Sequence, residues 1–113
     1  MAYVCAVIFV ETPSFTRRVK ELLCDDDLRR LQAFLAENPT AGDVIEGTGG
    51  LRKIRAAMAS RGKSAGARVI YYHFASLARI AMLMIYPKNE RDNLTHDQRA
   101  ALRQVVEHWR HPP

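Results

Sequence analysis

The sequence is poor in the features that define several protein classes. It has only two cysteines, Cys5 and Cys24, in 113 residues, too few for a disulfide framework, which favours a reduced compartment. No apolar run approaches the roughly 20 residues that a bilayer-spanning helix needs. The apolar N-terminus lacks a basic leader and a cleavage site and reaches Glu11 after ten residues, so we do not interpret it as a signal peptide. We therefore expect a cytoplasmic protein with no membrane partner.

The common catalytic signatures are also missing. The sequence contains no paired-carboxylate motif, no metal-ligand spacing of Cys and His, and no Gly-x-Ser-x-Gly elbow. Strand packing or a helix terminus is the simpler explanation for each histidine, and core packing is the simpler one for both cysteines. We expect neither a metal nor another cofactor.

Acidic side chains are absent from residues 47–89, which hold eight of the basic ones and carry a net charge of +8. Residues 1–46 have five basic and eight acidic side chains, and residues 90–113 have four of each. All of the positive excess therefore lies in the middle third of the chain. A surface of one sign attracts and steers phosphates, and the sequence pI of about 9.6 agrees with a nucleic-acid partner.

The length and the 48% hydrophobic content fit one small domain, residues 1–113. Residues 3–10 are rich in β-branched and aromatic side chains and predict a buried strand. Two helices follow and should pair as an antiparallel hairpin. The first begins near Thr12 or Ser14 and the second starts at residues 25–27 and ends at Asn38. Their predicted core positions are Phe15, Val19, Leu22, Leu23, Leu28, Leu31, Phe34 and Leu35.

Sheet is predicted for the middle of the chain, with strands at residues 51–57, 67–74 and 79–86. The last is apolar on both faces, as an interior strand would be. Tyr71, Tyr72 and Phe74 are expected in the core, and Gly49-Gly50 in a tight turn that needs positive φ. A capping box at residues 95–98 starts a final helix, whose packed stripe is predicted to comprise Leu102, Val105, Val106 and Trp109.

Four cations of the basic segment are candidates for one site. Lys53 and Arg55 alternate with Arg52 and therefore share a strand face, where two like charges are stable only with water or an anion between them. Arg68 opens the next strand, where an antiparallel pairing would place it beside them, and Lys88 follows the third strand. Each alone is more simply a solvated charge, but together they predict a patch suited to a phosphodiester.

RNA would make such a patch sufficient for catalysis. The 2′-hydroxyl is a built-in nucleophile, so the enzyme must align it, remove its proton, stabilise the developing charge and help the 5′-oxygen to leave. Neighbouring cations disfavour the ammonium form of a lysine and lower its pKa, which suits it to act as a base. Arginine stays protonated and binds phosphate through two donors.

Several segments together resemble one known family, the RelE-like toxins of bacterial toxin–antitoxin systems, and most closely its HigB branch. The segments read GDVIEGTGGLRKIR at 42–55, GK at 62–63, RVIYY at 68–72 and IYPKNE at 85–90, and a helix closes through Trp109. The resemblance implies an α+β fold, with a helical hairpin and a C-terminal helix packed on a small mainly antiparallel sheet. It further implies an mRNA interferase that enters the ribosomal A site, cuts the mRNA to leave a 2′,3′-cyclic phosphate, and is neutralised by a HigA-like antitoxin.

Positions that match the family pattern carry the implied roles. Lys53 corresponds to a candidate base, Arg55 and Arg68 to phosphate clamps, and Lys88 to a phosphate contact or proton donor. Arg61 and Lys63 would grip ribosomal RNA or the mRNA backbone. Arg52 and Tyr86 are further candidates for RNA or ribosome contact, Tyr86 being as compatible with the core as with base stacking.

Two other functions stay open, and so do the acid and base roles. Some relatives place a tyrosine beyond the last basic residue, and residues 89–94 contain none. The same scaffold supports ParE-like toxins that inhibit gyrase without catalysis, and a basic nucleic-acid-binding module would also explain the charge. The cluster of Lys53, Arg55 and Arg68 favours RNA cleavage over gyrase inhibition. The basic module instead predicts that replacing any one cation weakens binding only a little and in a salt-dependent way.

Overall fold

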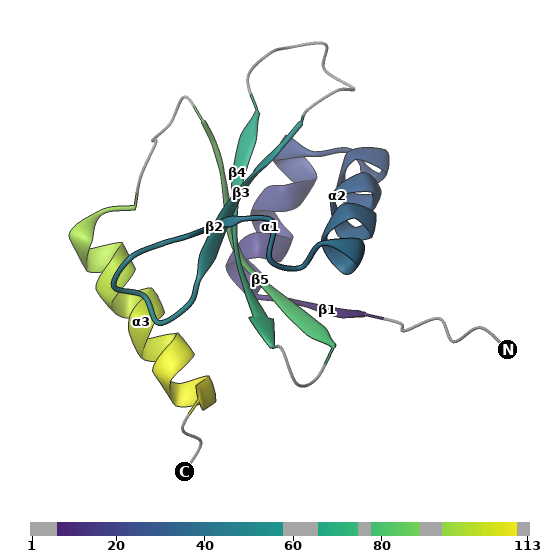
Figure 1. The fold of residues 1–113 in the computed structure, drawn as a ribbon. Helices are drawn as coiled ribbons and strands as arrows, with labels where there is room; N and C mark the ends of the chain where they lie inside the picture. The colour runs from purple at the N-terminus through teal and green to yellow at the C-terminus, as the bar shows by residue number, and fades with distance from the viewer. Residues whose placement is uncertain (1–6, 58–65, 75–77, 89–93, 111–113) are drawn as a thin grey trace, which may run out of the picture.

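A five-stranded sheet lies between two helical layers (Figure 1). The computed structural model describes residues 7–57, 66–74, 78–88 and 94–110. The strand order is β1-β5-β4-β3-β2. β1 runs parallel to β5 and the other neighbours are antiparallel, which confirms the predicted α+β fold with a mainly antiparallel sheet. The strands are β1 (Ile8–Glu11), β2 (Asp43–Val44), β3 (Arg52–Ala56), β4 (Ala67–Phe74) and β5 (Arg79–Pro87).

The three helices divide between the two faces of the sheet. α1 (Pro13–Leu22) and α2 (Asp25–Glu37) cover one face, and α3 (His96–Arg110) covers the other (Figure 1). No helix in the described part of the chain is both long and apolar enough to cross a membrane.

Side-chain caps set where the first two helices begin. Thr12 Oγ1 accepts a hydrogen bond from the Phe15 N–H at 3.1 Å and donates to the Leu83 carbonyl at 2.6 Å, which ties the start of α1 to β5. Cys24 caps α2, its Sγ accepting from the Asp27 N–H at 3.5 Å. Cys24 is exposed, so the prediction that it fills the core is wrong. Cys5 lies outside the described residues.

The first hydrophobic cluster fills the space between the sheet and the pair α1 and α2. Full burial of an aliphatic or aromatic side chain of this kind contributes about 1.5–3 kcal/mol. Phe34 was also predicted in this cluster, but 48% of it is exposed because α2 turns that position outward. The buried members are Phe15, Val19, Leu22, Leu23, Leu31, Leu35, Ala56, Ala67, Val69, Tyr71, Ile80, Met82 and Ile85.

The second cluster lies under α3. The predicted capping box is confirmed, since Thr95 and Gln98 exchange hydrogen bonds at 3.0 and 3.1 Å. Val106 is fully buried, and the Trp109 ring packs against the aromatic pair of β4, Tyr72 and Phe74. Val105 was predicted in the packed stripe but is 38% exposed. The buried members are Leu51, Ile70, Ala81, Leu83, Tyr86, Leu94 and Val106.

The two edges of the sheet differ from the sequence-based prediction. β1 was predicted as a buried strand over residues 3–10; it begins at Ile8 within the described residues, lies at an edge, and leaves Ile8 and Val10 exposed. β2, only two residues long, was not predicted as a separate strand.

A tight turn joins β2 to β3 and sets their register. Gly47, Gly49 and Gly50 have φ of 77°, 82° and 121°, which confirms the interpretation of Gly49-Gly50 as a turn that needs glycine. The buried Thr48 closes the turn, because its Oγ1 donates to the Ile45 carbonyl at 2.6 Å and accepts from the Leu51 N–H at 3.2 Å.

Candidate functional site

A row of three side chains crosses the sheet from β3 to β5. The register pairs Arg55 with Arg68 and Arg68 with Tyr86. Side chains alternate along a strand, and Leu51 and Ile70, an even number of residues away, belong to the cluster under α3. The row therefore lies on the α3 face. Like charges placed directly opposite each other on neighbouring strands repel, so an anion bound between Arg55 and Arg68 would stabilise this part of the sheet.

Arg68 lies in the middle of the row and carries an unsatisfied donor. Its side chain is half-buried, and its Nε is buried with no hydrogen-bond partner among the described residues. A buried donor left unmet costs about 1–3 kcal/mol, so such a group in a native structure needs an explanation, of which a catalytic role or a bound ion is one.

The Arg55 side chain lies over Gly66 at the start of β4. A Cβ built on Gly66 would come within 2.9 Å of Arg55 Nε and 3.0 Å of the Ala56 carbonyl. Glycine is therefore required there by close approach. The Lys88 N–H donates to the Gly66 carbonyl at 3.0 Å, so the end of β5 is fixed at the same place. The structure thus brings Arg55, Arg68 and Lys88 to one end of the sheet, as predicted from the sequence.

Lys53 lies on the same face as Arg55, two residues along β3, in a different environment. It is in register with Asp43 on one side and Ile70 on the other. A pocket of about 240 Å³ is lined by Lys53 together with Asp43, Glu46 and Arg99. The sequence-based argument gave Lys53 only cationic neighbours and missed Asp43, because β2 was not predicted.

Two of the predicted RNA-contacting residues have other roles in the structure. Arg52 points to the opposite face and donates to the carbonyls of Thr40 and Gly42 at 3.1 and 2.8 Å, so it fixes the chain before β2. Tyr86 is 1% exposed, which places its ring in the core and excludes base stacking on it in this conformation. Arg61 and Lys63 lie outside the described residues.

Tyr71 holds the segment that precedes β2. Its hydroxyl donates to the Pro39 carbonyl and accepts from the Gly42 N–H, both at 2.9 Å. Burial raises the pKa of Tyr71 above its usual 10.0, against a smaller lowering by the Gly42 hydrogen bond. This tyrosine positions β2, and with it Asp43, opposite Lys53.

Arg99 was not predicted as a site residue. It precedes Leu102 by three positions and Val106 by seven, a spacing that places it on the packed side of α3. The sequence shows this periodicity, but no pattern within the segment indicates that this side of α3 approaches β3.

The comparisons with known proteins agree with this architecture. A family model described as the RelE toxin of the RelE / RelB toxin-antitoxin system matches residues 8–111. One chain of the intact E. coli RelBE toxin-antitoxin complex aligns with a TM-score of 0.57 and 14% sequence identity, over 71% of this chain and 94% of that one. A mutant E. coli RelE in the free state aligns with a TM-score of 0.55 and 13% sequence identity, over 77% of this chain and 88% of that one. The isolated E. coli RelE toxin aligns with a TM-score of 0.55 and 12% sequence identity, over 88% of this chain and 99% of that one. These structures show a common fold, and the match over residues 8–111 shows that the chain belongs to the RelE toxin family.

Proposed function

We propose that this protein is a toxin of the HigB branch that cleaves mRNA in the ribosomal A site. The observation that supports this most is the Arg55–Arg68 pair, two opposed cations on one sheet face with the buried Arg68 Nε unmet among the described residues. A phosphodiester supplies negative charge between the two cations and an acceptor oxygen for the buried Arg68 Nε.

The reaction that fits these groups is an in-line attack within the RNA strand. The 2′-oxygen forms a bond to phosphorus, and the bond from phosphorus to the 5′-oxygen breaks, giving a 2′,3′-cyclic phosphate and a free 5′-hydroxyl. Arg55 and Arg68 bind the non-bridging oxygens, where charge develops. Lys53 removes the 2′-hydroxyl proton, and Lys88 donates a proton to the leaving oxygen or adds a phosphate contact.

The ribosome and an antitoxin are the proposed partners. The basic middle third supplies the attraction to ribosomal RNA. E. coli RelE has been solved in a complex named as toxin and antitoxin, and we propose that a HigA-like antitoxin neutralises this protein in the same way.

The test is a cleavage assay with purified protein and a defined mRNA, with and without ribosomes programmed by that mRNA. We expect cuts only with ribosomes, inside the A-site codon, and none when the nucleotide 5′ to the cut is 2′-deoxy. Cuts in free RNA would support the nuclease activity but contradict its dependence on the ribosome. Growth arrest without cuts in either RNA would contradict the proposal and favour a ParE-like inhibitor.

A further inference from the structure

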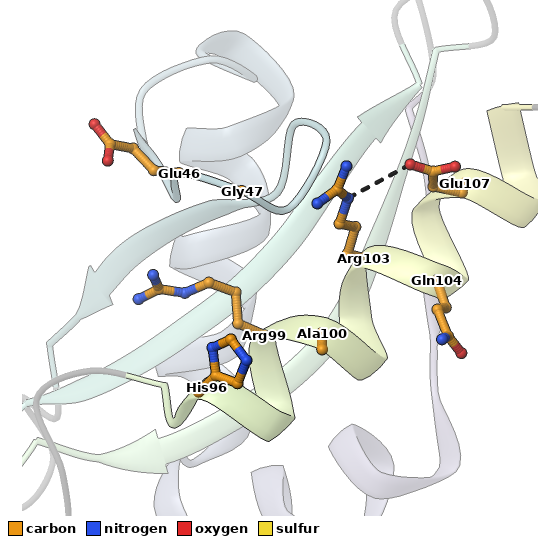
Figure 2. Close-up of a pocket in the computed structure, with 8 residues that line it drawn as sticks. All are labelled: Glu46, Gly47, His96, Arg99, Ala100, Arg103, Gln104 and Glu107. Atoms are coloured by element: carbon orange, nitrogen blue, oxygen red, sulfur yellow. Dashed lines mark ion pairs between the residues drawn. The ribbon is translucent and has the colours of Figure 1, made fainter.

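Arg99 brings a second unmet guanidinium donor to the same face of the sheet. It comes from the first turns of α3, and Figure 2 shows its side chain reaching from that helix beneath the Glu46–Gly47 segment. A Cβ on Gly47 would lie 3.9 Å from Arg99 Cδ, so the aliphatic stem packs against the turn. Its Nε is buried and has no hydrogen-bond partner in the described part of the chain.

Arg99 connects two pockets. It lines the pocket of about 240 Å³ with Lys53, and also a larger one of about 770 Å³ that runs along α3 past Arg103 (Figure 2). Arg103 forms an exposed ion pair with Glu107 at 3.5 Å, whereas Arg99 forms no ion pair with any residue that the structure describes. Lys53 and Arg99 thus approach one space from two elements far apart in the sequence.

The spacing along β3 relates this space to the Arg55–Arg68 row. Lys53 and Arg55 are two residues apart on one face, a separation of roughly 6.6 Å along a strand. This is comparable to the distance between consecutive phosphates of a nucleic-acid strand. A strand with one phosphate at Arg55 and Arg68 therefore brings its neighbouring phosphate within reach of Lys53 and Arg99.

We propose that Arg99 forms a second phosphate-binding position beside Lys53, so that the site holds two consecutive phosphates of one RNA strand. The proposal rests on the function above, which places the scissile phosphate at Arg55 and Arg68. Asp43 and Glu46 line the same pocket and repel a free anion. The second position therefore acts on a strand already held at the first, where the effective concentration is high.

Uncleavable 2′-O-methyl oligonucleotides with one or two internucleotide phosphates test this with the purified protein. In the wild type we expect the second phosphate to tighten binding by about three- to tenfold. Arg99→Ala should lose this gain and lower the slope of log affinity against log salt by about 0.7 for the two-phosphate ligand. Arg99→Lys should recover part of the gain. Arg103→Ala, one helical turn further on and exposed, is the matched control and should keep it.

The outcomes separate this proposal from the proposed function. An unchanged gain in Arg99→Ala, an equal loss in Arg103→Ala, or no gain in the wild type would each overturn the second phosphate position, whatever the cleavage assay shows. If the gain depends on Arg99 while the wild type cuts no RNA on ribosomes, the phosphate position stands and the proposed function is wrong.

Discussion

Arg55 and Arg68 lie directly opposite each other in the β3–β4 register, and Arg55 extends over Gly66, two residues before Arg68. Two adjacent guanidinium groups repel, and the buried Nε of Arg68 has no acceptor among the described residues. An anion between the two side chains would offset this repulsion and accept the Arg68 hydrogen bond. Such local conflicts mark functional sites in otherwise consistent structures.

Gly66→Ala should reduce cleavage by displacing Arg55. The new methyl group would meet Arg55 Nε at 2.9 Å and the Ala56 carbonyl at 3.0 Å, and overpacking of this kind costs about 1–3 kcal/mol of stability. Cleavage rates of the single and double variants with Arg55→Ala check the cause. If the effect passes through Arg55, Gly66→Ala adds little in the Arg55→Ala background; full additivity would contradict this account.

Arg52→Ala and Lys53→Ala should separate structural from catalytic roles at adjacent positions. Arg52 donates to two carbonyls on one face, so its loss should lower the free energy of unfolding by about 1 kcal/mol and leave cleavage per folded molecule unchanged. Lys53→Ala should keep the fold and lower the cleavage rate by about 100-fold or more, the usual effect of losing a proton-transfer group. Thermal unfolding and single-turnover cleavage measure the two effects, and an exchange of the two phenotypes would refute the assignment.

Tyr71→Phe should destabilise the protein by about 1–3 kcal/mol, because the Gly42 N–H loses its acceptor in a buried place. The effect should depend on pH. Since burial raises the Tyr71 pKa above 10.0 in the folded state, the neutral phenol contributes its full stabilisation below about pH 10 and loses it as the pH rises through the folded pKa. Urea unfolding at neutral and alkaline pH measures both variants. A difference that stays constant or grows above pH 10 would contradict the buried phenol.

Val106→Asp and Val105→Asp form a matched pair on α3. Val106 is fully buried beneath the helix, whereas Val105 is 38% exposed. An uncompensated buried carboxylate costs about 3–5 kcal/mol, so Val106→Asp should lower the melting temperature strongly and Val105→Asp only slightly. Equal melting temperatures for the two variants would mean that α3 packs by another face.

The elements that the sequence predicted well have strong local patterns. β4 and β5 alternate or run apolar over eight and nine residues, and the Thr95–Gln98 capping box is a local exchange of hydrogen bonds. β2 could not be recognised because its two residues form a strand only through their pairing with β3. The hydrophobicity of residues 8–10 was taken as a sign of burial, but strand order across the sheet is non-local and places β1 at an edge.

The site, like the fold, was predictable where it depends on local patterns and on the pairing of neighbouring strands. Alternation along β3 and the antiparallel pairing with β4 were enough to place Arg55 beside Arg68. The partners of Arg52 and the approach of Arg99 to Lys53 depend on how distant elements dock, and no periodicity within residues 51–57 or 95–109 encodes them.

The most direct test of the central claim is primer extension on programmed ribosomes with wild type, Arg68→Ala and Arg79→Ala. Arg79 is an exposed cation of the same basic segment at the opposite end of β5, so it controls for general charge. We expect A-site cuts from the wild type and Arg79→Ala, and a rate lowered by about 100- to 1,000-fold in folded Arg68→Ala, the effect of removing one donor to a developing oxyanion. Cuts from folded Arg68→Ala at the wild-type rate would show that the Arg55–Arg68 pair is not the site of cleavage.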